Sequence, residues 1–187
     1  MKPFAKYINM IKNRKLRKKV KDFIEELPVS NKYFKKYRRT DLKDAPAGPE
    51  NFHHGYKGGL IEHTKSVTNL CIHIAKSLKE TYPNIKINID TLIASAILHD
   101  IMKVHTFYIG KNGVNHSGVL LDHGVWAAAE LYKHDFPEDV IHCVSTHGGS
   151  EINPPLTIEA YILRYADLVD TEIDILMRQT MLKELMK

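Results

Sequence analysis

Apolar residues recur at helical spacing along most of this chain, and polar residues fill the positions between them. A repeat of three or four residues is typical of amphipathic helices, whose apolar face packs on a core. Proline and glycine interrupt the pattern, because proline is excluded from helix interiors and glycine favours turns. The pattern predicts helices over residues 4–27 (as one or two), 59–82, 89–103, 119–134, 137–147 and from Thr157 onward.

The segment from Phe107 to His116 departs from this pattern. Asn112 and Gly113 stand between two short β-prone runs, and Asn-Gly is the strongest local signal for a hairpin turn. The expected elements are therefore helices with one small β-hairpin excursion near residues 107–116, too small to be called a sheet.

The helix expected over residues 89–103 is apolar nearly all round, with Asp90 as its candidate N-cap, and such a helix is normally buried. It carries His99 and Asp100 side by side. Burying an imidazole beside a carboxylate is unfavourable unless both groups are satisfied, and a metal ion between them satisfies both. A buried hydrogen bond is the simpler explanation when this dipeptide is considered alone. Lys103 lies about one turn later and returns to the face of Asp100.

Four further residues strengthen the metal interpretation, because each falls on the inward face or at the end of a different expected helix. These residues are His63, His123, His147 and Asp167. Their spacing leaves room for one helix and one connection between successive ligands, as in the carboxylate–histidine sites of helical bundles. Arg164 and Asp170 lie about one turn from Asp167 and could neutralise or orient it. We expect His53 and His54 to be ordinary loop histidines.

Composition limits the class of protein. The chain has 187 residues, enough for one domain, or one domain with an extension, that buries a core without disulfides. Cys71 and Cys143 lie in apolar helical contexts and are expected to be buried thiols in a reducing compartment. No secretory leader and no apolar run of membrane-spanning length are recognisable. The expectation is a soluble, cytoplasmic protein without membrane contact.

The net charge of +5 conceals an asymmetry along the chain. Residues 1–43 contain 15 Lys and Arg but only 4 Asp and Glu, whereas residues 44–187 contain 12 and 18, respectively. The basic segment also contains Tyr33, Phe34 and Tyr37, and cations interleaved with aromatic rings suit single-stranded nucleic acid. A solvated helix face that docks through its apolar stripe explains the same pattern. We expect a basic, helical N-terminal extension over residues 1–43 and a separate domain over residues 44–187.

Several motifs resemble the HD superfamily of metal-dependent phosphohydrolases, and in particular the HD domain of YhaM-type 3′→5′ exoribonucleases. The matching segments are residues 45–48 (APAG), 53–64 (HHGYKGGLIEHT), 98–103 (LHDIMK), 122–124 (DHG), 146–149 (THGG), 159–161 (EAY) and 165–168 (YADL). The likeness covers roughly residues 45–172 and is specific in order and spacing. Two features differ: Met102 stands where the family usually has glycine, and residues 1–43 do not match the N-terminal OB-fold of those exonucleases.

The resemblance implies an all-α HD-domain helical bundle over residues 44–187 and an enzyme that uses divalent ions. The residues implied to hold a first ion are His63, His99, Asp100 and Asp167. Those implied to hold a second ion are His123 and His147, with Asp100 bridging. The candidate catalytic residues are Asp100 and Lys103, and the candidate substrate-binding residues are Lys103 and Arg164.

Such a site suits the hydrolysis of phosphate esters. Imidazoles with few carboxylates favour Mn, Fe, Co, Ni or Zn over Mg, and a metal pair both activates water and clamps the attacking and leaving oxygens. The leading hypothesis is a phosphohydrolase that cleaves a nucleotide or single-stranded RNA, with 3′→5′ exoribonuclease activity as one form. The alternatives are a small-nucleotide hydrolase (nucleotidase or cyclic-dinucleotide phosphodiesterase) and a nucleic-acid-binding module with a structural metal. The amphipathic stretch from Ile175 to Met186 could pack on the domain or join two copies as a homodimer.

Overall fold

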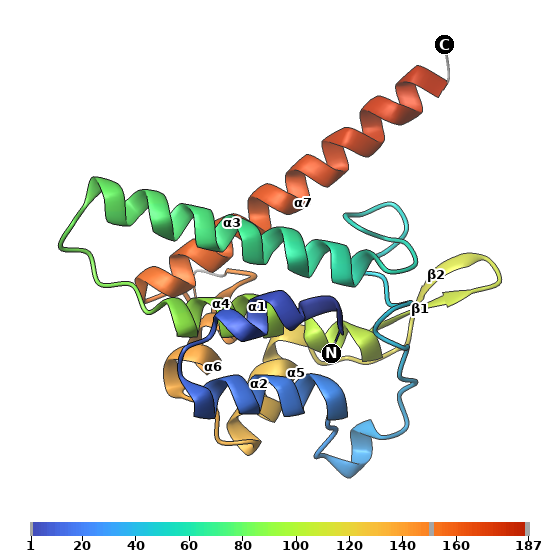
Figure 1. The fold of residues 1–187 in the computed structure, drawn as a ribbon. Helices are drawn as coiled ribbons and strands as arrows, with labels where there is room; N and C mark the ends of the chain where they lie inside the picture. Colours follow the sequence, from blue (N-terminus) through green and yellow to red (C-terminus); the bar gives the residue numbers. More distant parts are fainter. Residues whose placement is uncertain (1, 150–151, 186–187) are drawn as a thin grey trace.

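The computed structural model describes residues 2–149 and 152–185, and this part of the chain forms seven α-helices and one β-hairpin (Figure 1). The helices are α1 (Ala5–Met10), α2 (Arg14–Glu26), α3 (Gly59–Thr81), α4 (Ile89–Leu98), α5 (His123–Lys133), α6 (Glu138–Thr146) and α7 (Ile158–Leu185). Short 3₁₀ helices occur at η1 (Lys2–Phe4), η2 (Lys32–Phe34) and η3 (Ile101–His105). The strands are β1 (Phe107–Gly110) and β2 (Gly113–His116). The prediction of a helical fold with one small hairpin is confirmed.

Helix α4 lies at the centre of the bundle. Every residue from Thr91 to Leu98 is buried, in agreement with an apolar pattern that covers most of the helix circumference. Helices α1, α2, α3, α6 and α7 all contact α4, and α3 also packs against α7. Side chains from several helices can therefore reach the C-terminal end of α4.

The N-terminus of α4 is capped by Asn88, not by Asp90 as predicted. The Asn88 side chain accepts a hydrogen bond from the backbone N–H of Thr91. The Asp90 carboxylate instead accepts hydrogen bonds from the backbone N–H groups of Lys12 and Asn13, at 2.8 and 2.7 Å. Asp90 therefore ties the junction of α1 and α2 to the start of α4.

Two other helix boundaries also differ from the prediction. Helix α4 stops at Leu98 and η3 follows, so the continuous helix expected as far as residue 103 is wrong. Helix α5 begins at His123, because the Asp122 side chain caps its first free N–H groups. Leu120, which the helix predicted over residues 119–134 would include, is 97% exposed in the preceding loop.

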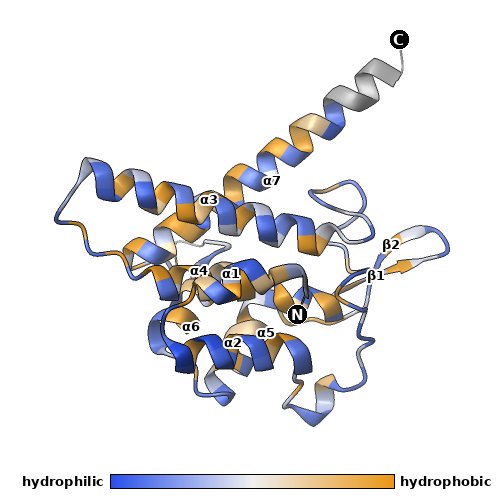
Figure 2. Ribbon diagram, in the orientation of Figure 1, coloured by the Kyte–Doolittle hydropathy of each residue, from blue (hydrophilic) through white to orange (hydrophobic). Residues whose placement is uncertain are grey.

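The apolar stripe of α1 and α2 belongs to the main core. Phe4, Ile11 and Val20 are completely buried in the same apolar cluster as residues of α4. The opposite face of α2 carries its lysines and arginines, and Figure 2 shows this helix as largely hydrophilic on its visible surface. The docked, solvated helix face is thus the arrangement in the structure, whereas a domain boundary at residue 43 stays a prediction.

Of the three aromatic residues expected to stack on nucleic acid, Tyr33, Phe34 and Tyr37, two are packing residues. The rings of Phe34 and Tyr37 lie with their centroids 4.8 and 6.3 Å from the Trp126 ring. Both side chains are partly buried against the core. Tyr33 is 71% exposed, so only this ring is open for the stacking that single-stranded nucleic acid requires.

Helix α7 packs on the bundle through its first half, and its second half projects away from the other helices (Figure 1). The amphipathic stretch predicted from Ile175 to Met186 lies in this projecting part; its side chains from residue 180 onward are outside the described ones. No helix in the described part of the chain is long and apolar enough to cross a membrane. Cys71 and Cys143 are buried free thiols, as expected.

Candidate metal centre

The six side chains predicted to bind metal converge at the C-terminal end of α4. His63 lies in α3, His99 at the end of α4, Asp100 directly before η3, His123 at the start of α5, His147 at the end of α6 and Asp167 in α7. Five α-helices thus contribute to one cluster. Within it, two sets of three ligand atoms each lie within 4.8 Å of one another.

The first half-site consists of His63, His99, Asp167 and the Oδ2 atom of Asp100. The Nε2 atom of His63 lies 3.1 Å from Asp167 Oδ1 and 3.2 Å from Asp100 Oδ2. The Nε2 atoms of His63 and His99 are 3.2 Å apart. The imidazoles of His63 and His99 are both completely buried, so their Nε2 atoms face each other and the two carboxylates in the interior of the protein.

The second half-site consists of His123, His147 and the Oδ1 atom of Asp100. The Nε2 atom of His123 lies 2.9 Å from Asp100 Oδ1, and that of His147 lies 3.5 Å from the same oxygen. The two Nε2 atoms are 3.3 Å apart. The two oxygens of Asp100 therefore face different half-sites, which is the arrangement of a bridging carboxylate.

The outer nitrogen of each of these four histidines has a hydrogen-bond acceptor. The Nδ1 partners are Asp170 Oδ2 for His63 (2.7 Å), Ala96 O for His99 (2.9 Å), Asp122 Oδ2 for His123 (3.2 Å) and Val144 O for His147 (2.7 Å). A carbonyl or carboxylate at Nδ1 fixes the proton there and leaves a lone pair on Nε2. Lone pairs that face each other and carboxylates repel unless a cation lies between them, so the donor set fits a metal centre.

The pKa values follow from burial and the neighbouring charges. Burial lowers the pKa of His99 to about 4, which leaves its imidazole neutral at pH 7. Burial disfavours the charged form of Asp100, yet Lys103 and the surrounding histidines outweigh it and hold the pKa of Asp100 well below its ordinary value. For His63, burial lowers the pKa, but hydrogen bonds with three carboxylates raise it well above its ordinary value. In the metal-free protein the carboxylates are therefore ionised and His63 carries a second proton, which it would have to release for its Nε2 atom to bind a divalent ion.

Lys103 lies inside the cluster. Its Nζ atom is 2.6 Å from Asp100 Oδ2, and the whole residue is only 7% exposed. The turn of η3 brings the lysine back over the carboxylate, as the three-residue spacing predicts. The cation neutralises part of the charge of Asp100.

Arg164 and Asp170 were both expected beside Asp167, and they lie elsewhere. The guanidinium of Arg164 packs on the backbone of Gly149, where an added Cβ would lie 2.2 Å from its Cζ atom. Among the described residues, no hydrogen bond or ion pair joins Arg164 to the six ligands. Asp170 contacts His63 and not Asp167, since α7 turns its side chain toward α3.

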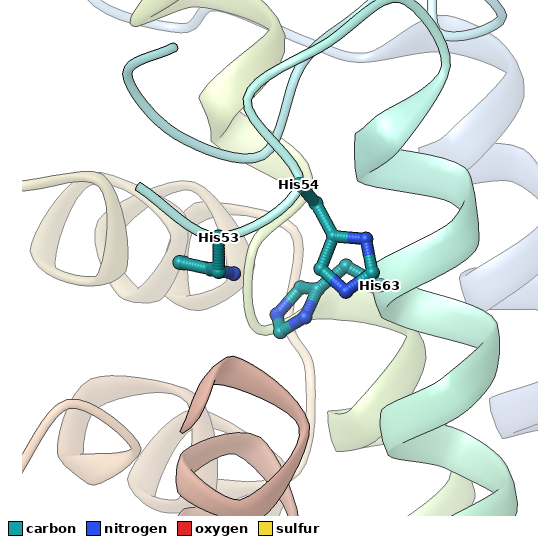
Figure 3. Close-up of side chains that lie close together, drawn as sticks. All are labelled: His53, His54 and His63. Atoms are coloured by element: carbon teal, nitrogen blue, oxygen red, sulfur yellow. The ribbon is translucent and has the colours of Figure 1, made fainter. Parts of the chain in front are cut away.

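His53 and His54 are not the ordinary loop histidines that we predicted. They are 4% and 5% exposed, and together with His63 they form a third group of closely spaced ligand atoms. Figure 3 shows the His54 and His63 rings beside each other, with His53 next to them on the same loop. Their position in the sequence could have predicted this burial, because they stand next to a glycine and shortly before a helix that bears a predicted metal ligand.

A cleft of about 350 Å³ opens at the second half-site, lined among others by Asp122, His123, His147 and Gly149. The His123 side chain is 23% exposed there. Solvent therefore reaches the second half-site through this cleft. A larger cleft, of about 600 Å³, runs along α7 beside Tyr56 and Arg178 and contains none of the six ligands.

A model of the HD domain family matches residues 60–172. The chain therefore belongs to the HD domain family, and the arrangement of its histidines and aspartates is that of a metal-dependent phosphohydrolase. A purely nucleic-acid-binding module with a structural metal is disfavoured accordingly.

Two relatives illustrate the range of the family. The chain is 41% identical over 177 residues to a dihydroneopterin 2′,3′-cyclic phosphate phosphodiesterase of Methanocaldococcus jannaschii, which covers 93% of this chain and 70% of the relative. It is 32% identical over 164 residues to the 3′-5′ exoribonuclease YhaM of Bacillus licheniformis, which covers 80% of this chain and 49% of the relative. The chain thus spans about half the length of this exoribonuclease. No solved structure matches the chain.

Proposed function

We propose that this protein is a two-metal phosphodiesterase that hydrolyses a small phosphodiester, such as a 2′,3′-cyclic phosphate. One observation carries the proposal: the two oxygens of Asp100 face two separate histidine pairs, His63 with His99 and His123 with His147. This arrangement would let Asp100 hold two divalent ions near each other, and such an ion pair would stabilise both the attacking and the leaving oxygen of a phosphoryl displacement.

The proposed size of the substrate follows from the surroundings of the site. The cleft at the second half-site measures about 350 Å³, which is the volume of a small-molecule pocket. Two of the three aromatic residues expected to stack RNA bases pack on Trp126 instead. The relative that matches along 93% of this chain acts on a small cyclic phosphate.

The side chains of the cluster have distinct tasks in this proposal. Bound divalent ions supply a water of lowered pKa and the positive charge that a phosphoryl transition state needs. Asp100 remains ionised beside Lys103 and so stays available as a ligand to both half-sites. Lys103 offers its remaining donors to a phosphate oxygen as a point charge. Arg164, at the edge of the cleft beside Gly149, is assigned a contact with a distal part of the substrate.

The proposed cofactor is a pair of divalent transition-metal ions. Four imidazoles with two carboxylates favour Mn, Fe, Co, Ni or Zn over Mg, which prefers oxygen ligands. Metal analysis of protein reconstituted with each ion in turn should give two ions per chain. One ion per chain in a fully active enzyme would refute the binuclear assignment.

The activity is tested by a substrate screen of metal-reconstituted protein. The panel contains dihydroneopterin 2′,3′-cyclic phosphate, 2′,3′-cyclic and linear mononucleotides, cyclic dinucleotides and 3′-labelled RNA. We expect the highest kcat/KM for a cyclic phosphodiester. Turnover of mononucleotides alone would instead identify a nucleotidase, and turnover of none of these compounds would refute the proposal.

A 3′→5′ exoribonuclease activity is the second candidate, and the charge of the N-terminal segment favours it. Residues 1–43 carry an excess of 11 positive charges, which suits a polyanion such as single-stranded RNA. Processive shortening of the labelled RNA in the same screen would put this candidate first.

We further propose that α7 joins two copies of the chain in a homodimer and that the protein is cytoplasmic. Tyr161, Tyr165, Leu168, Val169 and Ile173 are each about half exposed along one side of α7. An exposed apolar stripe of this length is typical of an interface. Replacement of Leu168 and Ile173 by Glu should convert a dimer to a monomer in light scattering, and a wild-type monomer would contradict the proposal. The buried free thiols support the reducing compartment.

A further inference from the structure

The loop before α3 holds its two histidines in a constrained conformation. His54 has φ +47°, in the left-handed region that residues other than glycine rarely adopt. The loop is tightly packed at this point, because a Cβ at Gly55 would lie 2.0 Å from the carbonyl oxygen of Pro49. Strained backbone that surrounding contacts enforce is often found at functional sites.

Every polar group of His54 has a partner. Its Nε2 atom lies 2.9 Å from Asp170 Oδ2, and its Nδ1 atom lies 3.1 Å from the hydroxyl of Tyr56. Its backbone N–H donates to Asp174 Oδ2 at 2.7 Å. The Oδ2 atom of Asp170 also accepts from His63 Nδ1 at 2.7 Å, so a single carboxylate oxygen lies between the two imidazoles.

These contacts exclude a third metal site at His53, His54 and His63, although their ligand atoms lie close together. Both ring nitrogens of His54 are engaged, and His63 uses Nδ1 for Asp170 and Nε2 for the first half-site. Among the described residues, His53 Nδ1 is the only buried ring nitrogen of this group without a hydrogen bond. One free nitrogen does not make a metal site.

We propose that His54 and Asp170 are positioning residues that fix the ring of His63 for the first metal ion, an inference that rests on the metal dependence in the proposed function. A ligand histidine needs an acceptor at its outer nitrogen to set its tautomer and orientation. Asp170 supplies that acceptor. His54 holds the carboxylate from its other side, and the loop in turn is held by Asp174 of α7.

The direction of the hydrogen bonds makes the inference specific. Asp170 Oδ2 accepts from both rings, so His54 carries a proton on Nε2. The Tyr56 hydroxyl donates to Glu62 Oε2 at 2.8 Å, and its oxygen lies 3.1 Å from His54 Nδ1. An asparagine at position 170 keeps one oxygen and can still accept, but it removes the negative charge that strengthens the His63 bond. A glutamine side chain at position 54 retains an amide group that can donate to Asp170, and an alanine side chain retains no donor.

The experiment measures the affinity of metal-stripped protein for Mn²⁺ by isothermal titration calorimetry, without any substrate. Loss of an outer partner of a metal-bound histidine typically weakens affinity by about 10–100-fold. We expect that range for Asp170→Asn, about tenfold for His54→Ala, and a smaller loss for His54→Gln. His73→Gln is the matched control, because His73 is exposed on the same helix as His63 and should leave the affinity unchanged.

Wild-type Mn²⁺ affinity in both Asp170→Asn and His54→Ala would overturn the inference. Circular dichroism and the melting temperature of the metal-free proteins show whether each variant is folded. If His54→Ala does not fold, the comparison of Asp170→Asn with His54→Gln still tests the inference. We expect the weaker Mn²⁺ affinity in Asp170→Asn, and equal affinities of these two variants would contradict the positioning role. A weakened metal site in a protein that hydrolyses no phosphodiester would refute the proposed function and leave the positioning role standing.

Discussion

The two half-sites of the metal centre are built from different parts of their helices. In the first, His63 and Asp167 project from within the long helices α3 and α7. The imidazoles of His63 and His99 are both completely buried. In the second, His123 is the first residue of α5 and His147 the residue after the last turn of α6. The cleft opens at this second pair. The two imidazoles of the first half-site are therefore shielded from solvent, although its Asp167 side chain is 19% exposed, whereas the second half-site opens to the cleft through His123.

The hydrogen-bond partners at the outer nitrogens of the histidines also differ in exposure between the two half-sites. His63 is held by Asp170, whose side chain is 9% exposed, whereas His123 is held by Asp122, whose side chain is 62% exposed. Solvent competes with an exposed carboxylate and weakens its hydrogen bond. We infer that the first half-site binds its ion more tightly, and that the second exchanges its ion and receives the substrate.

The largest effect is expected from Asp100, which belongs to both half-sites. Asp100→Asn keeps the shape of the side chain but removes the shared charge, so both ions should bind weakly. The metal pair supplies several kcal/mol of transition-state stabilisation, and kcat/KM should fall by at least about 10³-fold. Steady-state kinetics with excess metal measure this loss of kcat/KM. Asp135→Asn, at an exposed residue on a turn, is the control, and a small loss in Asp100→Asn would exclude a bridging role.

A smaller effect is expected when only one half-site is removed. His147→Gln should leave the first ion in place, reduce the metal content to one ion per chain and lower kcat/KM by about 100-fold, equivalent to about 2.7 kcal/mol. His99→Gln should reduce the affinity for the first ion and thereby lower the melting temperature in metal more strongly than His147→Gln does. Elemental analysis and thermal melting distinguish the two variants. Equal losses from both would contradict the difference between the half-sites.

The sequence predicts the convergence of six ligands because five of the helices have clear periodicity. Inward positions of a helix follow from a repeat of 3.6 residues, and this assigned His63, His123 and Asp167 to faces that meet. It also predicted the hairpin from one dipeptide. Residues whose direction depends on a regular helix are thus accessible to such reasoning.

Features that depend on irregular backbone were missed for a physical reason. In a continuous helix, His99 and Asp100 would point about 100° apart, but α4 ends at Leu98 and the change to η3 turns both toward one cluster. The burial of His53 and His54 depends on the path of a loop, which has no periodicity to read. The contacts of Asp170 and Arg164 depend on which neighbouring element each side chain faces. The spacing of these residues along α7 does not predict that element.

Metal-free protein offers a test by pH. Burial lowers the pKa of His99 to about 4, so it contributes stability that is fully present above its unfolded pKa of 6.5 and is lost as the pH falls toward 4. Burial also disfavours charged His123, but Asp100 and Asp122 outweigh it and raise its pKa. Its contribution is therefore present below pH 6.5 and is lost as the pH rises through the folded pKa. NMR titration of the ring signals, assigned with His99→Gln and His123→Gln, should give a lower titration midpoint for His99 than for His123. A higher midpoint for His99 would contradict these assignments of the pKa shifts.

The smallest effect is expected from the basic face of α2, which lies far from the accessible half-site. Lys19 Nζ donates to the carbonyl of His134 at the C-terminal end of α5, whereas the cleft lies at the N-terminal end of this helix, about 16 Å away for eleven residues. Neutralising Lys15, Arg17 and Lys18 with Gln, with Lys19 retained for its packing role, should leave KM for a small cyclic phosphate unchanged.

For single-stranded RNA, the same triple variant separates two roles of the segment. If α2 guides RNA, the slope of log affinity against log salt should fall by up to about 2, at roughly 0.7 for each lost phosphate contact. The distance of about 16 Å along α5 would then select for long substrates, because only a substrate long enough to span α5 can contact both α2 and the metal centre. Gel-shift titrations at several salt concentrations measure the slope, with Lys76→Gln on the exposed face of α3 as the control. An unchanged slope would reduce α2 to the docked helix that its buried apolar stripe already explains.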